Sequence, residues 1–107
     1  LAPEEAFRNL DAIISPLKKR HMAVLLAGML APPNLGADYG RDFRDIYARL
    51  ADKHKILLYP FLLEGVAAVP DLNQADGIHP TAEGQKIIAQ NLLPYVKALL
   101  NGKTSLE

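Results

Sequence analysis

Two residues with the chemistry of a general base and its orienting group lie three positions apart, at Asp76 and His79 in the stretch DGIHP. A carboxylate that accepts a hydrogen bond from one imidazole nitrogen fixes the tautomer of the ring. It also stabilises the imidazolium that forms when the other nitrogen takes a proton. Gly77 lets the backbone bend between the two side chains, and Pro80 stiffens the exit from the bend. The spacing therefore predicts the base and the orienting carboxylate of a hydrolytic triad.

The same stretch is also compatible with an ordinary turn. Asp-Gly is a common turn dipeptide, and an Asp-x-x-His pattern is short enough to arise by chance. From these residues alone the turn is the simpler interpretation, so the catalytic hypothesis depends on the rest of the chain.

Other polar side chains give weaker signals. His21 and His54 stand at the ends of predicted helices, where a cation is favoured, which indicates capping or surface roles. The three histidines share no ligand spacing such as HExxH, so no metal site is expected. Glu64 and Asp71 are expected to be solvated at the surface. Three tyrosines are expected to be packing residues with polar tips: Tyr39, Tyr47 and Tyr59.

The composition is that of one globular domain. The chain has 107 residues, half of them apolar, with a formal net charge of zero and no cysteine. These values exclude disulfide and thiol chemistry, and they give no general attraction to nucleic acid or to anionic membranes. No apolar run reaches the roughly 18 residues needed to span a bilayer, so no transmembrane segment is expected.

Helical and strand patterns alternate along the chain. Apolar stripes at helical spacing predict helices over residues 3–20, over 41–54, and from an N-cap at Thr81 to about residue 100. Two short continuous apolar runs, 22–29 and 56–61, predict strands buried on both faces, as in parallel sheets. Residues 30–40 are rich in proline and glycine and predict a loop.

This order predicts an α/β fold with a parallel sheet. Two parallel strands are too few, because such a sheet needs several strands with helices on both faces. We therefore expect the missing strands to lie in an upstream segment, a second chain or a symmetry mate. Ligands of open parallel sheets bind beyond the carboxyl ends of the strands, which both the loop at 30–40 and the Asp76–His79 segment can reach.

The segment DGIHPTAEGQKIIAQNLLPYV resembles the last block of the SGNH (GDSL-type) hydrolases, in which an Asp-x-x-His-Pro run precedes the final helix. Upstream, LLAGMLAPPNLGADYGRDFRDIYARLADKHKILLYPFLLEGVA resembles the corresponding stretch of the bacterial arylesterase, thioesterase I and lysophospholipase branch. The resemblance covers nearly all of residues 1–100, with its blocks in the family's order. It implies a three-layer α/β/α sandwich with a flavodoxin-like parallel sheet, to which this chain contributes about the C-terminal half.

By this resemblance, His79 is the general base and Asp76 its orienting carboxylate in a serine ester hydrolase that works through an acyl-enzyme. Pro33 and Asn34 in the PPNLG loop, together with Ile78, are expected to border an ester or thioester substrate, either a small molecule or a lipid. The resemblance implies no metal and no organic cofactor. It also leads us to expect a periplasmic or secreted location, whereas the composition favours no compartment.

The blocks that supply the nucleophile of this family are absent from the sequence. The resemblance places a Gly-Asp-Ser block, a glycine and a Gly-x-Asn-Asp run upstream of the matched region, where they form the nucleophile and the oxyanion hole. The only serines here are Ser15, inside the first predicted helix, and Ser105, near the polar end. We therefore expect a complementary N-terminal chain or segment to carry the serine. Two alternatives stay open, a catalytically incomplete fragment and a non-enzymatic interaction domain, either of them self-associating.

The chain is predicted to hold part of a single domain. Residues 1–102 are expected to form the C-terminal part of a hydrolase domain. Residues 103–107 are expected to form a polar tail, and whether the expression vector encodes this tail is left open. The sequence begins at Leu1 rather than at Met, so an upstream part of the natural protein is expected.

Overall fold

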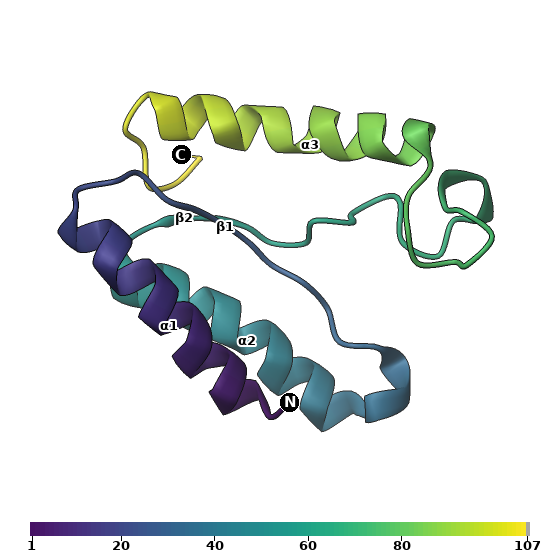
Figure 1. The fold of residues 1–107 in the computed structure, drawn as a ribbon, viewed down its shortest axis with the longest axis horizontal. Helices are drawn as coiled ribbons and strands as arrows, with labels where there is room; N and C mark the ends of the chain where they lie inside the picture. Colours follow the sequence, from purple (N-terminus) through teal and green to yellow (C-terminus); the bar gives the residue numbers. More distant parts are fainter. Residues whose placement is uncertain (107) are drawn as a thin grey trace.

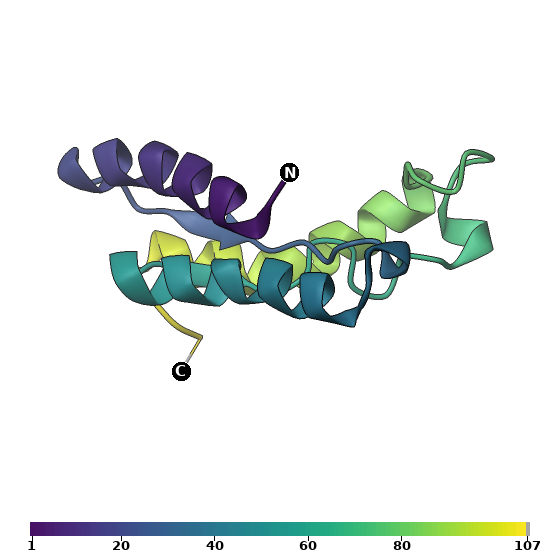
Figure 2. The same ribbon diagram turned by 90° about the horizontal axis from the view of Figure 1, so that it is seen from below.

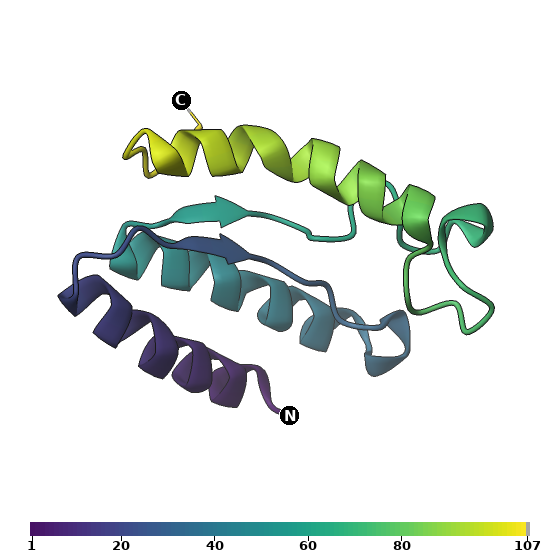
Figure 3. The same ribbon diagram turned by 45° about the horizontal axis from the view of Figure 1, so that its top comes forward.

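The computed structural model describes residues 1–106, which form three layers (Figure 1). The elements follow in the order α1 (Pro3–Lys19), β1 (Leu25–Ala27), η1 (Pro33–Leu35), α2 (Ala37–His54), β2 (Leu57–Tyr59), η2 (Pro70–Leu72) and α3 (Ala82–Leu100), where η marks a short 3₁₀-helix. The strands lie in the middle, α3 covers one face, and α1 and α2 lie on the other (Figure 3). The predicted α/β/α sandwich is therefore confirmed.

The two strands pair in parallel, with Leu26 opposite Leu58 at the centre of the register. Gly28 extends the pairing, because its N–H donates to the carbonyl of Tyr59 at 2.7 Å and its carbonyl accepts the N–H of Leu62 at 3.0 Å. Within residues 1–106 the sheet has these two strands alone. The larger sheet that the sequence predicts is not completed by this part of the chain.

Apolar side chains fill both gaps between the layers. On the α1 and α2 side, Ile14, Leu26 and Leu50 pack together with Ile56, and Leu50 is fully buried. On the α3 side, the ring of Tyr59 packs against that of Tyr95 with centroids 4.8 Å apart. Successive strand residues point to opposite faces, so β2 contributes to both halves of the core.

The predicted element bounds differ from the structure at two places. Both strands have three residues, fewer than the apolar runs 22–29 and 56–61 suggest, because such runs mark burial and pairing covers only part of the buried backbone. The predicted loop at 30–40 is wrong over much of its length. Its prolines start η1, and α2 begins at Ala37 directly after Gly36, which has φ 93°.

The polar tail turns back toward the sheet (Figure 1). Gly102 has φ 73°, and the N–H of Lys103 donates to the carbonyl of Ala98 at 3.0 Å, which closes α3. Residues 104–106 then line a pocket beside Leu58 of β2. No helix in the part of the chain that the structure describes is long and apolar enough to cross a membrane.

Candidate active site

A closed loop of residues 73–80, here called the site loop, carries the predicted base and its orienting group just before α3. Asn73 and Pro80 form an isolated antiparallel bridge at the base of the loop. The N–H of Gln74 donates to the carbonyl of His79 at 2.8 Å. The backbone therefore fixes the two ends of the loop without using the side chains of Asp76 or His79.

Asp76 uses both carboxylate oxygens. Oδ2 lies 2.7 Å from Nδ1 of His79, and Oδ1 accepts the backbone N–H groups of Ile78 at 2.9 Å and of His79 at 3.1 Å. Gly77 makes the bend between the two side chains with φ 70°, a left-handed value that favours glycine. The carboxylate thus holds the imidazole ring and the backbone of the same residue at once.

The hydrogen bond from the His79 ring lowers the pKa of Asp76 to about 2, with smaller contributions from the backbone N–H groups of Ile78 and His79. The carboxylate is therefore ionised at neutral pH and can only accept hydrogen bonds. Nδ1 of His79 must then be the donor, which leaves the lone pair of a neutral ring on Nε2. This is the tautomer that a general base requires.

The pair faces solvent. The side chains of His79 and Asp76 are 69% and 43% exposed, and no residue from 1 to 106 forms a hydrogen bond with Nε2. Neither serine lies beside His79: the hydroxyl of Ser15 donates to the carbonyl of Asp11 within α1 at 2.7 Å, and Ser105 lines the pocket beside Leu58 of β2. The described residues therefore supply an accessible base without a serine beside it.

The residues predicted to border the substrate are only partly brought together. Ile78 lies in the site loop next to His79, with 69% of its surface exposed. Pro33 and Asn34 are exposed on η1, which packs against α2 alone among the described helices and strands. Both segments lie at the carboxyl end of the strands, on the right of Figure 1, but no hydrogen bond joins them. The substrate roles of Pro33, Asn34 and Ile78 stay predictions.

Asn73 and Gly84 support the site loop from behind, although neither residue stands out in the sequence. The side-chain amide of Asn73 donates to the carbonyls of Val66 at 2.8 Å and Val69 at 2.9 Å, which ties the loop to the preceding turn. Gly84 lies in the first turn of α3, where a Cβ would stand 2.4 Å from the carbonyl oxygen of Leu72. The sequence offers one signal for Gly84: a glycine inside a helix lowers the stability of the helix by about 1 kcal/mol relative to alanine. A glycine at such a position therefore indicates close packing by a neighbouring segment.

The start of α3 is fixed by Thr81, as the sequence predicts. Its hydroxyl oxygen accepts the N–H of Gly84 at 3.2 Å, and its own N–H donates to the carbonyl of Leu72 at 2.9 Å. The helix therefore begins directly after His79 and Pro80, and its position sets that of the site loop.

A second histidine–aspartate pair joins α1 to α2. Nε2 of His54 lies 2.6 Å from Oδ1 of Asp11, and Nζ of Lys53 lies 2.9 Å from the same oxygen. Hydrogen bonds from Lys53 and then His54 lower the pKa of Asp11. The predicted capping or surface role of His54 is wrong, because its side chain is 10% exposed and ties two helices together.

The other expectations for polar residues agree with the structure. His21 is exposed and ends α1 with φ 58°, and Glu64 and Asp71 are exposed. Tyr39 stacks on Phe43, which also contacts Tyr47 edge-on.

Comparison with known proteins gives relatives of about twice this length. No family model matches the chain. It is 38% identical over 100 residues to "Esterase TesA" of Pseudomonas aeruginosa, covering 94% of this chain and 50% of TesA. It is 38% identical over 88 residues to "Arylesterase" of Vibrio mimicus, covering 82% and 44%. It is 32% identical over 99 residues to "Thioesterase 1/protease 1/lysophospholipase L1" of Escherichia coli K12, covering 92% and 48%. The chain thus spans about half the length of the curated relatives it matches.

Solved structures agree with these relatives. The crystal structure of TesA superposes with a TM-score of 0.86 at 37% identity, covering 92% of this chain and 55% of that one. The structure of AlinE4, described as an SGNH-hydrolase family esterase, gives 0.69 at 47% identity, with 94% and 53% covered. The psychrotrophic esterase EstA of Pseudoalteromonas sp. gives 0.87 at 24% identity and supports the fold alone.

Proposed function

Because the chain belongs to the SGNH hydrolase family, over about half the length of its relatives, we propose that it supplies the base and the orienting carboxylate of a serine ester hydrolase. His79 is the base and Asp76 is the orienting group. The observation that carries the proposal is the 2.7 Å hydrogen bond between Asp76 Oδ2 and His79 Nδ1, which leaves Nε2 free and exposed.

The proposed reaction is acyl transfer from an ester or thioester to water. Nε2 of His79 takes the proton of a serine hydroxyl as the serine oxygen attacks the carbonyl carbon, and the ionised Asp76 stabilises the imidazolium. Nε2 then gives this proton to the leaving alcohol or thiol. Water attacks the acyl-enzyme in a second round, in which His79 takes a proton from water and returns it to the serine oxygen.

The nucleophile comes, in this proposal, from a complementary N-terminal chain or segment. By the family resemblance, the serine and the oxyanion-hole donors precede the region that this chain matches. Two observations support a division of this kind: the relatives are about twice as long, and His79 lacks a neighbouring serine in the described residues.

The names of the relatives support ester and thioester substrates, since they include an esterase, an arylesterase and a thioesterase/lysophospholipase. Ile78 offers an exposed apolar side chain beside His79. We propose that it contacts the acyl chain or the leaving group, and that Pro33 and Asn34 border the substrate from η1.

The test combines this chain with the part of P. aeruginosa TesA that precedes the matched region, here called the TesA segment. Hydrolysis of p-nitrophenyl acetate by the assembly is expected to fall about ten-thousand-fold with His79→Ala, because loss of a triad member costs several decades in kcat. His54→Gln is the matched control, since His54 also pairs with an aspartate but lies between helices. Equal activity with His79→Ala, or no activity in an assembly that does form, contradicts the proposal.

A further inference from the structure

We infer that Asn73 is a positioning residue for the Asp76–His79 pair, and that its side-chain amide sets where the whole site loop stands against the body of the protein. This inference rests on the proposed function, because it concerns the placement of the base in that reaction. The pair forms its own hydrogen bonds within the loop. We expect its distance from the serine to depend on the amide that ties the loop to the core.

The site loop stands apart from the rest of the molecule. In Figure 2 the green segment between β2 and α3 projects past the start of α2, and η2 packs against α3 alone among the described helices and strands. Residues 74–79 are all exposed. Packing therefore does little to hold this loop, and its position depends on hydrogen bonds.

The hydrogen bonds of the Asp76–His79 pair are all internal to the loop. Asp76 bonds the ring and the N–H of His79, and also the N–H of Ile78. The N–H of Gly77 donates to the carbonyl of Gln74 at 2.9 Å, and the N–H of Gln74 donates to the carbonyl of His79. A loop bonded in this way can rotate about its base as a unit, because the rotation breaks none of these bonds. The chemistry of the pair and its placement are therefore separate properties.

Asn73 supplies the hydrogen bonds that lead out of the loop. Within residues 1–106, every hydrogen bond from residues 73–80 to an earlier segment comes from Asn73. Its backbone N–H donates to the carbonyl of Pro70 at 3.3 Å. Its Nδ2 donates to the carbonyls of Val66 at 2.8 Å and Val69 at 2.9 Å. This nitrogen carries two N–H groups, so both are used, and the side-chain bonds are the shorter ones.

The two carbonyls belong to a strained turn. The N–H of Val69 donates to the carbonyl of Val66 at 3.2 Å and closes the turn. Inside it, Ala68 has φ 63°, a left-handed value that is unfavourable for a residue with a Cβ. The amide of Asn73 bonds the carbonyls of both closing residues and so holds the turn in this conformation. Removing the amide would release the turn and the loop together.

Val66 connects the turn to the core. Its side chain is fully buried and lies against the first turn of α3, where a Cβ added to Gly84 would stand 3.1 Å from Cγ1 of Val66. At the base of the site loop, Asn73 forms the bridge with Pro80, the residue after His79. A continuous path therefore runs from the buried Val66, through the amide of Asn73, to the backbone that carries the base.

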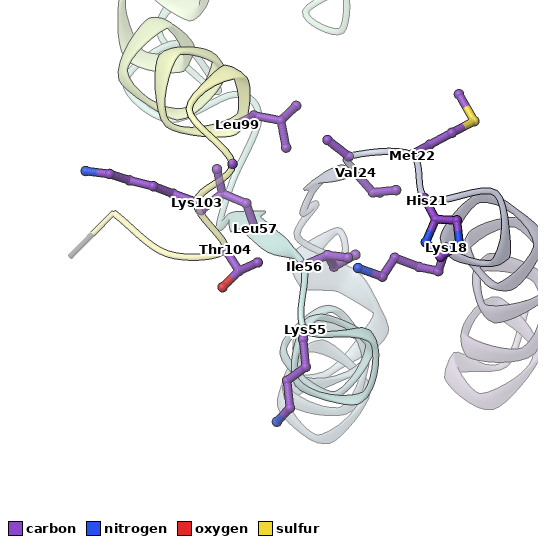
Figure 4. Close-up of a pocket in the computed structure, with 12 residues that line it drawn as sticks. Lys18, His21, Met22, Val24, Lys55, Ile56, Leu57, Leu99, Lys103 and Thr104 are labelled. Atoms are coloured by element: carbon purple, nitrogen blue, oxygen red, sulfur yellow. The ribbon is translucent and has the colours of Figure 1, made fainter.

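A pocket at the opposite end of the sheet provides the control. This pocket of about 390 Å³ lies at the amino end of the strands, and Ile56 is among its lining residues (Figure 4). Ile56 is buried and packs in the core with Ile14 and Leu50. Ile56→Val removes one buried methyl group and lowers the stability, but it leaves the site loop and the turn 66–69 unaltered. It therefore reports what a loss of stability alone does to the loop.

The first test follows the site loop by NMR in the isotope-labelled chain, with and without the TesA segment. Order parameters of the backbone N–H groups in residues 75–79 are expected near about 0.85 in the unaltered chain and in Ile56→Val, and to fall toward about 0.6 in Asn73→Ala. Those of α3 should not change. The pKa of Asp76 should stay at about 2 in Asn73→Ala, because the groups that lower it lie within the loop.

The second test measures kcat of the assembly with the TesA segment on p-nitrophenyl acetate. Asn73→Ala is expected to lower kcat at least about tenfold, because misplacing a catalytic group by about 1 Å costs about a hundredfold. Ile56→Val should keep the unaltered rate. Asn73→Leu matches the branched shape of asparagine without its N–H donors, so it should behave like Asn73→Ala in both tests.

Four results would overturn the inference. The first is a site loop that is as rigid in Asn73→Ala as in the unaltered chain, and the second is a mobile loop with unchanged kcat. The third is recovery of rigidity or kcat in Asn73→Leu, which would indicate packing instead of hydrogen bonding. The fourth is a rise of the Asp76 pKa toward 3.8 in Asn73→Ala, which would mean that Asn73 is needed to form the pair.

Failure of the proposed function gives a different result. An unaltered assembly that hydrolyses no ester contradicts the proposed function, whereas the order parameters still decide whether the amide of Asn73 holds the site loop.

Discussion

Replacing Gly84 with alanine is predicted to displace the site loop. Gly84 lies where the first turn of α3 meets Leu72, and an added Cβ would stand 2.4 Å from the Leu72 carbonyl oxygen and 3.1 Å from Cβ of Pro80. The same carbonyl accepts the N–H of Thr81 at 2.9 Å, so it cannot retreat without disturbing the helix start. Strain at this point therefore reaches both ends of the loop.

The size of the stability loss follows from the close approach of the added Cβ to the Leu72 carbonyl oxygen. Real Cβ contacts essentially never fall below 3.0 Å, so this distance must grow from 2.4 Å by at least about 0.6 Å. Overpacking costs about 1–3 kcal/mol, against a gain of up to about 1 kcal/mol for alanine over glycine in a helix. The free energy of unfolding is expected to fall by about 1–2 kcal/mol. Since misplacing catalytic groups by about 1 Å costs about a hundredfold, kcat of the assembly with the TesA segment should fall roughly tenfold.

Urea unfolding followed by circular dichroism measures the stability change. Gly40→Ala is the matched control, because Gly40 lies inside α2 and an added Cβ would meet nothing within 4 Å. That variant is expected to gain about 0.5–1 kcal/mol from helix propensity. If Gly84→Ala and Gly40→Ala have the same free energy of unfolding, the result contradicts the close packing of α3 against Leu72.

Three further predictions concern the site and its support. The pKa of Asp76, followed by NMR of its carboxyl carbon, should be about 2 and should rise in His79→Ala toward its usual 3.8, because the largest cause of the shift is removed. Since the pKa of Asp76 is lower in the folded state than in the unfolded state, its stabilisation of the fold is complete above about pH 4–5 and is lost as the pH falls toward 2. A pKa of Asp76 that does not change in His79→Ala would contradict the hydrogen bond between the two side chains. Thr81→Ala should cost about 1 kcal/mol in urea unfolding, whereas Thr81→Ser should keep most of the cap, and equal losses would argue against the cap. Leu50→Ala should cost about 2–5 kcal/mol, and a loss below 1 kcal/mol would contradict the complete burial of Leu50.

The order of elements could be predicted because it depends on local patterns. Apolar stripes at helical spacing locate all three helices, and Thr81 identifies the start of α3. The element bounds were harder to predict. The proline- and glycine-rich segment 30–40 predicts a loop, yet Gly40 lies inside α2. The other residues of α2 offset the low helix propensity of this glycine.

Contacts between distant segments could not be predicted from spacing. His54 and Asp11 are 43 positions apart, and only the packing of α1 on α2 brings them together. The need for glycine at position 84 depends on the carbonyl of Leu72, which belongs to another element. By contrast, Asp76 and His79 are three positions apart, so their hydrogen bond is local and could be anticipated from the DGIHP stretch.

The use of both Asp76 oxygens is visible only in the structure. Spacing predicts that the carboxylate can reach the imidazole, but not that Oδ1 also holds the N–H groups of Ile78 and His79. These two bonds fix the backbone that carries the ring. The orienting role of Asp76 therefore extends beyond the contact with Nδ1.

The most direct measurement of the central claim is a double-mutant cycle on the ester hydrolysis of the assembly, with Asp76→Asn, His79→Ala and both changes together. If Asp76 acts through His79, each single change lowers kcat by several decades, and the double variant is no slower than His79→Ala alone, because groups that act as a unit are non-additive. If the two losses multiply, Asp76 and His79 act independently, and the assignment of an orienting carboxylate and its base is contradicted.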